Sequence, residues 1–352
     1  MLAWYFVWFL VFISQGYWWF AEGKTITGIF FGLSIWFFSG DLLHSGTHFA
    51  VFESAKTNML AGYLSGCLHA NPSAWIRQHV IGHHAYTNMD GKDPDLYHFE
   101  VLHFWLGIIG FRLSETSVYK PMYRHWRALC VVCMVVTGIG PLVIESIAFL
   151  VSSKYLSFWV ADQHSPIPTR ERIGASLQWT AVVMAFVFVF RTHGAWSAWV
   201  PFAVHGVIYY AFSQVSHANS ASQPSVDLET TVHPIEAAFG VGGVTIKHRR
   251  RLEVCGEKKK EAQGEWVMHQ WRTSLGDYAG DSVFWSMLSL GLNLQSVHHL
   301  FPNVHWWHYR EMYGVLCEVL EQPSTATERS FGQALGDHFS FVAALNDATK
   351  EV

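Results

Sequence analysis

The stretch "QHVIGHHAYTN" (Gln78–Asn88) concentrates histidine in a chain that is otherwise strongly apolar. It places three histidines within six residues, namely His79, His83 and His84. Two further clusters exist, "HSGTH" at residues 44–48 and "QSVHHLFPNV" at residues 295–304. The function of the protein must explain why imidazole gathers at three separate places.

The composition is that of a membrane protein. The chain has 352 residues, of which 51% are hydrophobic and 14% are charged, whereas soluble domains carry about 25% charged residues. The formal net charge of −4 gives no sign of a nucleic-acid partner. The 5 cysteines are odd in number and scattered, so they do not form a disulfide framework.

Four apolar segments are long enough to cross a bilayer, which needs about 20 residues. The first starts at once, with no basic region before it, and we interpret it as a retained span, not a signal peptide. We expect transmembrane helices at residues 2–20, 26–43, 174–190 and 195–212.

A fifth apolar segment, residues 126–152, contains Glu145, whose charge would be costly at bilayer depth. If the histidine clusters share one side of the membrane, an even number of spans must separate the second cluster from the third. We therefore expect residues 126–152 to lie along the interface or to re-enter the membrane.

The basic residues fall on the same side as the histidines, for example Arg170, Arg172 and "KHRRR" at residues 247–251. The positive-inside rule then makes that side cytoplasmic, together with both termini. The chain is expected to be a single all-α membrane domain, residues 1–352. Interfacial helices and a cytoplasmic helical cap, residues 44–125 and 213–352, would hold a di-metal site.

The spacing of the histidines suits metal binding. His44 and His48 are four residues apart, as are His79 and His83, and such pairs share one face of a helix. His84 lies off that face and can reach a neighbouring metal. Neutral imidazole is a ligand for zinc, copper, iron and nickel. The three clusters in this order, placed around membrane spans, predict a site with more than one metal.

These motifs resemble the three histidine boxes of the integral-membrane fatty acid desaturase and hydroxylase superfamily. The closer resemblance is to front-end acyl desaturases. It rests on "QHVIGHHAYTN" followed by "GKDPDLY", and on "FWSMLSLGLNLQSVHHLFPNV", where Gln295 replaces the first histidine of the third box. It extends from about residue 40 to residue 320.

The resemblance implies an acyl desaturase with two non-haem iron ions and O₂ as co-substrate. It also implies a fatty acyl substrate and a further ligand just after the last span, which "QVSHAN" supplies as His217. The implied metal-binding and catalytic residues are His44, His48, His79, His83, His84, His217, Gln295, His298 and His299. Asp41, Asp93 and Asp95 lie near the boxes and could orient the ligands, as could His305 and His308.

The sequence also departs from the family pattern. The residues inside "HSGTH" are not the usual ones, and residues 233–260 form a longer segment than usual. Only "HPIE" at His233 resembles the haem motif of a fused cytochrome b5 domain, so we expect an external donor of the cytochrome b5 or ferredoxin type. The basic residues 247–260 could steer that donor or contact anionic lipid.

Alternative functions remain open at this stage. A hydroxylase or acetylenase could use the same scaffold. A metal transporter would place histidines within its spans, and a structural zinc site would need only four ligands. The expected location is a multi-pass position in the endoplasmic reticulum of a eukaryote, or in the inner or thylakoid membrane of a bacterium.

Overall fold

The computed structural model describes residues 1–65, 68–88, 168–217, 219, 222, 266–321 and 325–348. Within these ranges every regular element is helical, as expected for an all-α protein. The helices before the first long gap are α1 (Leu2–Glu22), α2 (Thr25–Ser34), η1 (Ile35–Gly40), α3 (Asp41–Thr47), α4 (Ala55–Ser65), α5 (Pro72–Trp75), η3 (Ile76–His83) and α6 (His84–Tyr86). The helices after it are α11 (Thr169–His193), α12 (Ala195–His217), α14 (Trp266–Thr273), α15 (Val283–Ser289), η6 (Leu292–Leu294), α16 (Gln295–Leu300), η7 (Trp306–His308), α17 (Tyr309–Val319), α18 (Thr325–Glu328) and α19 (Phe331–Ala348).

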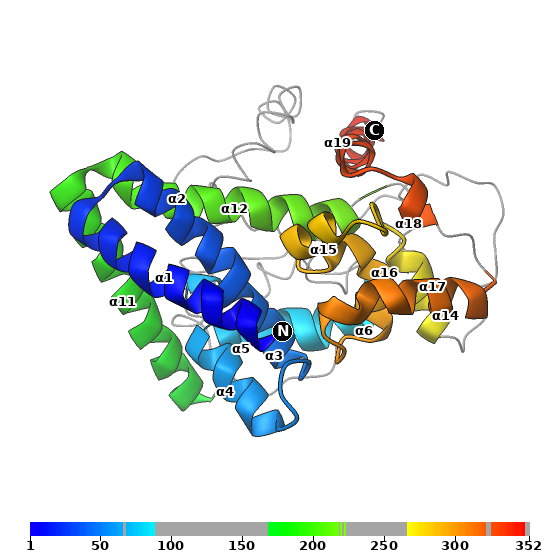
Figure 1. Cartoon of the computed structure of the whole chain (residues 1–352), viewed down its shortest axis with the longest axis horizontal. Helices are drawn as coiled ribbons and strands as arrows, with labels where there is room; N and C mark the ends of the chain where they lie inside the picture. The colour runs from blue at the N-terminus through cyan, green and yellow to red at the C-terminus, as the bar shows by residue number, and fades with distance from the viewer. Residues whose placement is uncertain are drawn as a thin grey trace, which may run out of the picture.

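Two long helical hairpins, α1–α2 and α11–α12, lie side by side on the left of Figure 1. Helix α2 packs against both α1 and α12. A Cβ atom on Gly32 would lie only 2.5 Å from the carbonyl oxygen of Pro201, so glycine permits this close approach of α2 to α12. Trp19 Nε1 donates a 2.6 Å hydrogen bond to the Ser197 carbonyl and links α1 to α12 as well.

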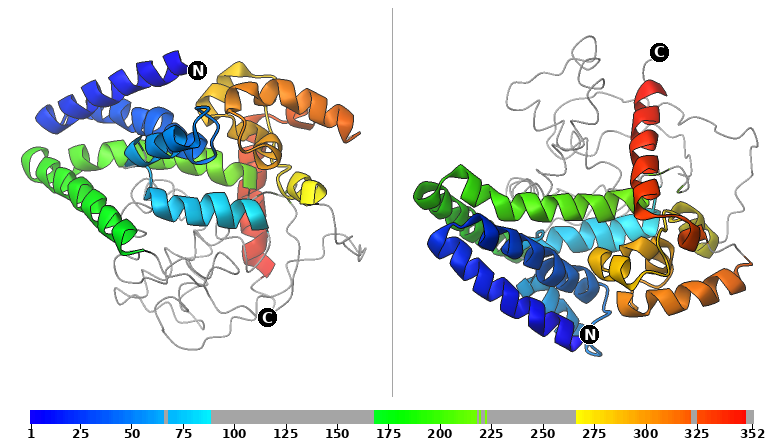
Figure 2. Two further views of the ribbon diagram at one scale, coloured as in Figure 1. Left: turned by 90° about the horizontal axis from the view of Figure 1, so that it is seen from below. Right: turned by 45° about the horizontal axis from the view of Figure 1, so that its top comes forward.

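The turns of the two hairpins lie together at one end of the helices (Figure 2). Gly23 ends α1 in the left-handed conformation, with φ 62°, and a Cβ there would lie 2.3 Å from Cβ of His193. Trp196 Nε1 also donates to Thr25 Oγ1 at 3.0 Å, across the two turns. His217 is at the end of α12 away from these turns, and His44 is in α3, which continues α2 through η1 away from the turns. The two hairpins therefore bring both histidines to the same side.

Two segments among the described residues are long and apolar enough to cross a membrane, Thr25–Thr47 and Thr169–His193. They correspond to two of the four expected spans. The other two expected spans form the helices α1 and α12, which do not meet the same criterion. Tryptophan and tyrosine in α1, and Pro201 and His205 in α12, lower the mean hydropathy of these helices. The expected count of four spans therefore stays a prediction.

Two segments of π-helix lie near the first two clusters: η1 precedes the α-helix α3 that carries His44, and η3 replaces the α-helix expected at the second cluster. η1 carries the chain from α2 into α3, and η3 contains both His79 and His83. A π-turn has hydrogen bonds from residue i to i+5, and such turns occur frequently at functional sites. The wider turn changes the direction in which the following side chains point, which spacing alone does not reveal.

The helices α14 to α17 belong to the expected cap and lie on the right of Figure 1. Their core is aromatic and continuous with the end of α12, because Trp271, Tyr278, Leu294 and Tyr313 belong to the same buried cluster as Val215. The expected interfacial segment 126–152, residues 89–125 and the basic residues 247–260 lie outside the described residues.

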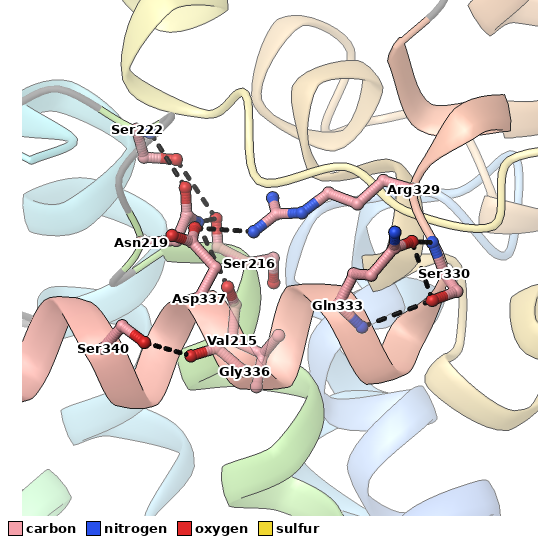
Figure 3. Close-up of polar contacts among 10 residues, drawn as sticks. All are labelled: Val215, Ser216, Asn219, Ser222, Arg329, Ser330, Gln333, Gly336, Asp337 and Ser340. Carbon is pink, nitrogen blue, oxygen red and sulfur yellow. Dashed lines mark hydrogen bonds and ion pairs between the residues drawn. The ribbon is translucent and has the colours of Figure 1, made fainter.

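Polar contacts fix the end of α12, as Figure 3 shows. Asn219 Nδ2 donates to the carbonyl oxygens of Val215 and Ser216, at 3.1 and 3.0 Å, and Ser222 Oγ donates to the latter at 3.3 Å. Near them Arg329 and Asp337 form an ion pair at 2.6 Å. Unpaired carbonyls at a helix end need such donors, so the last turn of α12, which carries His217, is held in place.

Candidate metal centre

The first group of imidazoles combines all three histidine clusters. It consists of His44, His48, His79 and His298, whose ligand nitrogens lie within 4.8 Å of one another. His44 Nε2 is 3.1 Å from His298 Nε2, although 254 residues separate them in the chain. Helix α3, its C-terminal cap, η3 and α16 each contribute to this first imidazole group.

The second imidazole group consists of His83, His217 and His299, which meet the same distance criterion. The Nε2 atoms of His83 and His299 lie 3.2 Å apart. The histidine after the last expected span therefore joins the second and third clusters. All three of these side chains are buried.

The two consecutive histidine pairs divide between the groups. Neighbouring residues of a helix point about 100° apart, since a turn takes 3.6 residues. On α16, His298 thus faces the first group and His299 the second. His83 faces the second group, whereas His84 Nε2 lies 3.1 Å from His298 Nε2, next to the first. Each pair of consecutive histidines therefore places one ring at the first group and the other at the second.

Gln295 occupies the place next to the second group. Its Nε2 atom lies 3.0 Å from His217 Nε2, and its side chain is fully buried. The structure thus gathers every histidine predicted for the site, and Gln295 with them, into one buried region. Their roles as metal ligands are addressed below as a proposal.

The ring nitrogens that face away from the groups have partners that the sequence analysis missed. His298 Nδ1 lies 3.0 Å from the Tyr309 hydroxyl. His299 Nδ1 lies 3.1 Å from Gln270 Oε1 and 3.0 Å from Thr87 Oγ1. Outer partners of this kind hold metal-ligating histidines in orientation. Neither spacing nor charge marks Gln270 or Tyr309 in the sequence, because each is uncharged and lies outside the three histidine clusters.

Burial keeps the imidazoles uncharged. Desolvation lowers the pKa of His48, His84, His298 and His299 well below the usual value, and the neighbouring histidines lower it further. A neutral imidazole carries one N–H and one lone pair. The site therefore offers several lone pairs in a small volume with no carboxylate in either group.

This donor set fits metal ions. Among the described residues, His48 Nε2 and Gln295 Oε1 are buried without a hydrogen-bond partner. A buried polar atom without a partner costs about 1–3 kcal/mol. A cation between the imidazoles of each group would satisfy such atoms and relieve the crowding of facing nitrogens.

The acidic and outlying candidates have other roles in the structure. Asp41 accepts hydrogen bonds from Ser45 Oγ at 2.8 Å and from the indoles of Trp4 and Trp306 at 3.2 and 3.1 Å. It therefore links α3 to α1 and to η7 and does not orient a histidine by these bonds. His305 lies 3.0 Å from the Tyr5 hydroxyl. His308 precedes α17 as its N-cap and is exposed. Asp93 and Asp95 lie outside the described residues.

A pocket lies against the two imidazole groups. It contains about 530 Å³ of space not filled by atoms, part of which is open to solvent, and His44, His79, His217 and Gln295 form part of its wall. Aromatic and aliphatic side chains form much of the rest, among them Trp36, Tyr209 and Leu290. The pocket could thus hold an apolar molecule directly beside the imidazoles.

His69 also lines this pocket. Its Nδ1 atom lies 2.8 Å from His205 Nε2, and both side chains are buried. This pair is separate from the two imidazole groups and agrees with a structural role.

Comparison with known proteins places these features in a family. The family model "Fatty acid desaturase" matches residues 17–329. The chain is 23% identical to the "sn-1 linoleoyl-lipid 6-desaturase" of Arthrospira platensis over 98% of this chain and 83% of the relative. It is 24% identical to "Acyl-lipid (8-3)-desaturase B" of Dictyostelium discoideum, over 92% of this chain and 64% of the relative.

A third relative is the "Acyl-lipid omega-13 desaturase" of Chlamydomonas reinhardtii, 22% identical over 88% of this chain and 58% of the relative. The chain thus spans only about six-tenths of the length of the Dictyostelium and Chlamydomonas proteins. No solved structure matches the chain. The family model covers most of the sequence, including all three histidine clusters, and the chain therefore belongs to the fatty acid desaturase family.

Proposed function

We propose that this protein is a membrane-bound desaturase that introduces a double bond into a fatty acyl chain. The observation that carries the proposal is the pocket whose wall includes His44, His79, His217 and Gln295. An apolar chain in that pocket would lie directly against the imidazole groups. The names of the relatives support the same reaction class.

The proposed reaction removes two vicinal hydrogens from the acyl chain. With O₂, two electrons and two protons as co-reactants, the products are one carbon–carbon double bond and two molecules of water. Iron, when bound, would supply the oxygen activation that no side chain of the site can perform. The ligands we propose are His44, His48, His79, His83, His84, His217, Gln295, His298 and His299.

The protein side chains would position the two reactants. The apolar side of the pocket, with Trp36 and Leu290, would hold the methylene chain, since burial of each CH₂ is favourable by about 0.8 kcal/mol. The opposite wall would present the imidazoles to one short segment of that chain. The shape of the pocket would therefore decide which carbons react.

We further propose that α1, the continuous helical segment Thr25–Thr47 formed by α2, η1 and α3, α11 and α12 cross the membrane and that the imidazole groups face the cytoplasm. The two hairpin turns lie together, which supports the same orientation for both hairpins relative to the membrane. Histidine and glutamine cannot supply electrons, so a reductant must act in every turnover. A small donor of the cytochrome b5 or ferredoxin type is the partner we propose.

Expression in a host of known lipid composition, followed by mass spectrometry of its fatty acids, tests the proposal. The expected product is lighter than its precursor by two hydrogens, and His299→Ala should abolish it. A product that gains one oxygen would instead establish a hydroxylase. An unchanged fatty acid profile, with protein present in the membrane, would contradict the proposal.

A further inference from the structure

Gln270 connects two of the histidine-bearing elements from outside the imidazole groups. It belongs to α14, its side chain is fully buried, and it bonds both to the segment after η3 and to α16. None of the sequence motifs includes it. Its three hydrogen bonds determine what it can do.

The orientation of the Gln270 amide is fixed by the protein backbone. Its Nε2 atom lies 2.8 Å from the carbonyl oxygen of His84, which can only accept a hydrogen bond. Nε2 must therefore be the donor there. The other amide atom, Oε1, then faces His299 Nδ1 at 3.1 Å and Thr87 Oγ1 at 3.0 Å.

This orientation determines the tautomer of His299. The amide oxygen is only an acceptor, and the Thr87 hydroxyl, which is also 3.0 Å from Nδ1, can direct its single hydrogen to the carbonyl oxygen of His83 at 2.8 Å, so Nδ1 of His299 carries the hydrogen. In a neutral imidazole the lone pair is then on Nε2. That atom points to the second group, 3.2 Å from His83 Nε2. Gln270 thus leaves His299 with its lone pair where a metal ion would need it.

His298 does not have the same constraint. Its Nδ1 atom meets the hydroxyl of Tyr309 at 3.0 Å, and a hydroxyl can donate or accept. The Tyr309 contact alone therefore does not select one tautomer. The two imidazole groups differ in this respect, and a change at Gln270 should affect the second group alone.

We propose that Gln270 is a positioning residue that fixes the tautomer and ring orientation of His299 and thereby sets the metal affinity of the second imidazole group. The inference rests on the proposed function in so far as both groups bind metal. Loss of such an outer partner reduces metal affinity by about 10–100-fold in known sites.

Anaerobic titration of the purified full chain with Fe²⁺, against a chromogenic chelator, measures both affinities without any need for turnover. Gln270→Leu should weaken one of the two sites by about 10–100-fold and leave the other unchanged. Gln270→Glu keeps an acceptor oxygen toward His299 but loses the donor to the His84 carbonyl, so it should retain more of the affinity of the affected site than Gln270→Leu does. His338→Leu is the control, since it removes a buried hydrogen bond, to Tyr210 at 3.0 Å, outside both groups.

The control should lower the unfolding temperature while both iron affinities stay at the parent value. The inference is overturned if Gln270→Leu binds two Fe²⁺ ions like the parent. It is also overturned if Gln270→Leu and Gln270→Glu weaken both sites equally, because that pattern indicates general damage to the fold. A parent protein that binds no Fe²⁺ would overturn the proposed function as well, whereas a two-iron parent with an unaffected leucine variant overturns this inference alone.

Discussion

The Nε2 atoms of His84 and His298 lie 3.1 Å apart, and this contact places His84 against the first imidazole group. The ring of His84 also stacks on His299, with centroids 4.5 Å apart, and lies 4.5 Å from the ring of His48. His84 therefore touches members of both groups. A residue in this place influences both metal positions together.

We expect His84→Ala to abolish desaturation and to lower the iron content below that of the parent. The substitution removes an imidazole that neighbours His48, His298 and His299 at once. Lipid analysis in the expression host and iron determination on purified protein provide the measurements. His193→Ala is the control, because His193 lies at the hairpin turns and contacts the Phe20 carbonyl. Equal activity of the two variants would show that His84 is not part of the site.

Much of this site could be predicted because metal ligands repeat in short patterns. The spacing of His44 and His48, and the adjacent pairs at His83 and His298, are visible without a structure. The division of each adjacent pair between two groups was not predicted. It depends on the local helix direction, and η3 is a π-helix where spacing suggested an α-helix.

The outer partners could not be predicted because they depend on tertiary contacts. Gln270 lies 29 residues before His299 and reaches it only because α14 packs against α16. Asp41 illustrates the opposite error, since its position beside the first cluster suggested a bond to histidine. Its oxygens instead accept hydrogen bonds from Ser45, one turn along the same helix, and from the indoles of Trp4 and Trp306, which belong to other helices.

Gln295 should matter more for activity than for metal retention. An amide oxygen is a weaker ligand than imidazole, and Gln295 lies at the edge of the second group, beside His217. We expect Gln295→Ala to lose most of its activity while it retains more iron than His299→Ala. Product formation and iron content, measured on the same preparations, test this order. If Gln295→Ala is as active as the parent, the prediction is wrong and Gln295 has only a packing role.

Gly276 allows the cap to pass the end of α12, and its substitution should destabilise the protein. A Cβ atom at Gly276 would lie 1.9 Å from the carbonyl oxygen of Ser216, which is backbone and cannot rotate away. Overpacking of this kind costs about 1–3 kcal/mol. We expect Gly276→Ala to lower the unfolding temperature and, since Ser216 precedes His217, the iron content.

The matched control is Gly174→Ala in α11, where a Cβ atom would meet nothing within 4 Å. Alanine is favoured over glycine within a helix by up to about 1 kcal/mol, so this variant should be at least as stable as the parent. Equal stability of the two alanine variants would mean that the contact between Gly276 and Ser216 is not restrictive.

His305 should make the stability of the protein depend on pH in the acidic range. Burial, then the amino terminus and His308, lower the pKa of His305 from 6.5 to about 3. Its Nδ1 accepts the backbone N–H of Trp307 at 3.2 Å, so Nε2 carries the hydrogen that faces Tyr5. The folded protein thus keeps His305 neutral, whereas the unfolded chain takes up a proton below about pH 6.5. The stability that His305 contributes is therefore complete above pH 6.5 and is lost as the pH falls toward 3. For one group this amounts to at most about 1.4 kcal/mol per pH unit.

Denaturant unfolding at a series of pH values should show a shallower acid-side slope for His305→Gln than for the parent, and identical slopes would contradict this prediction.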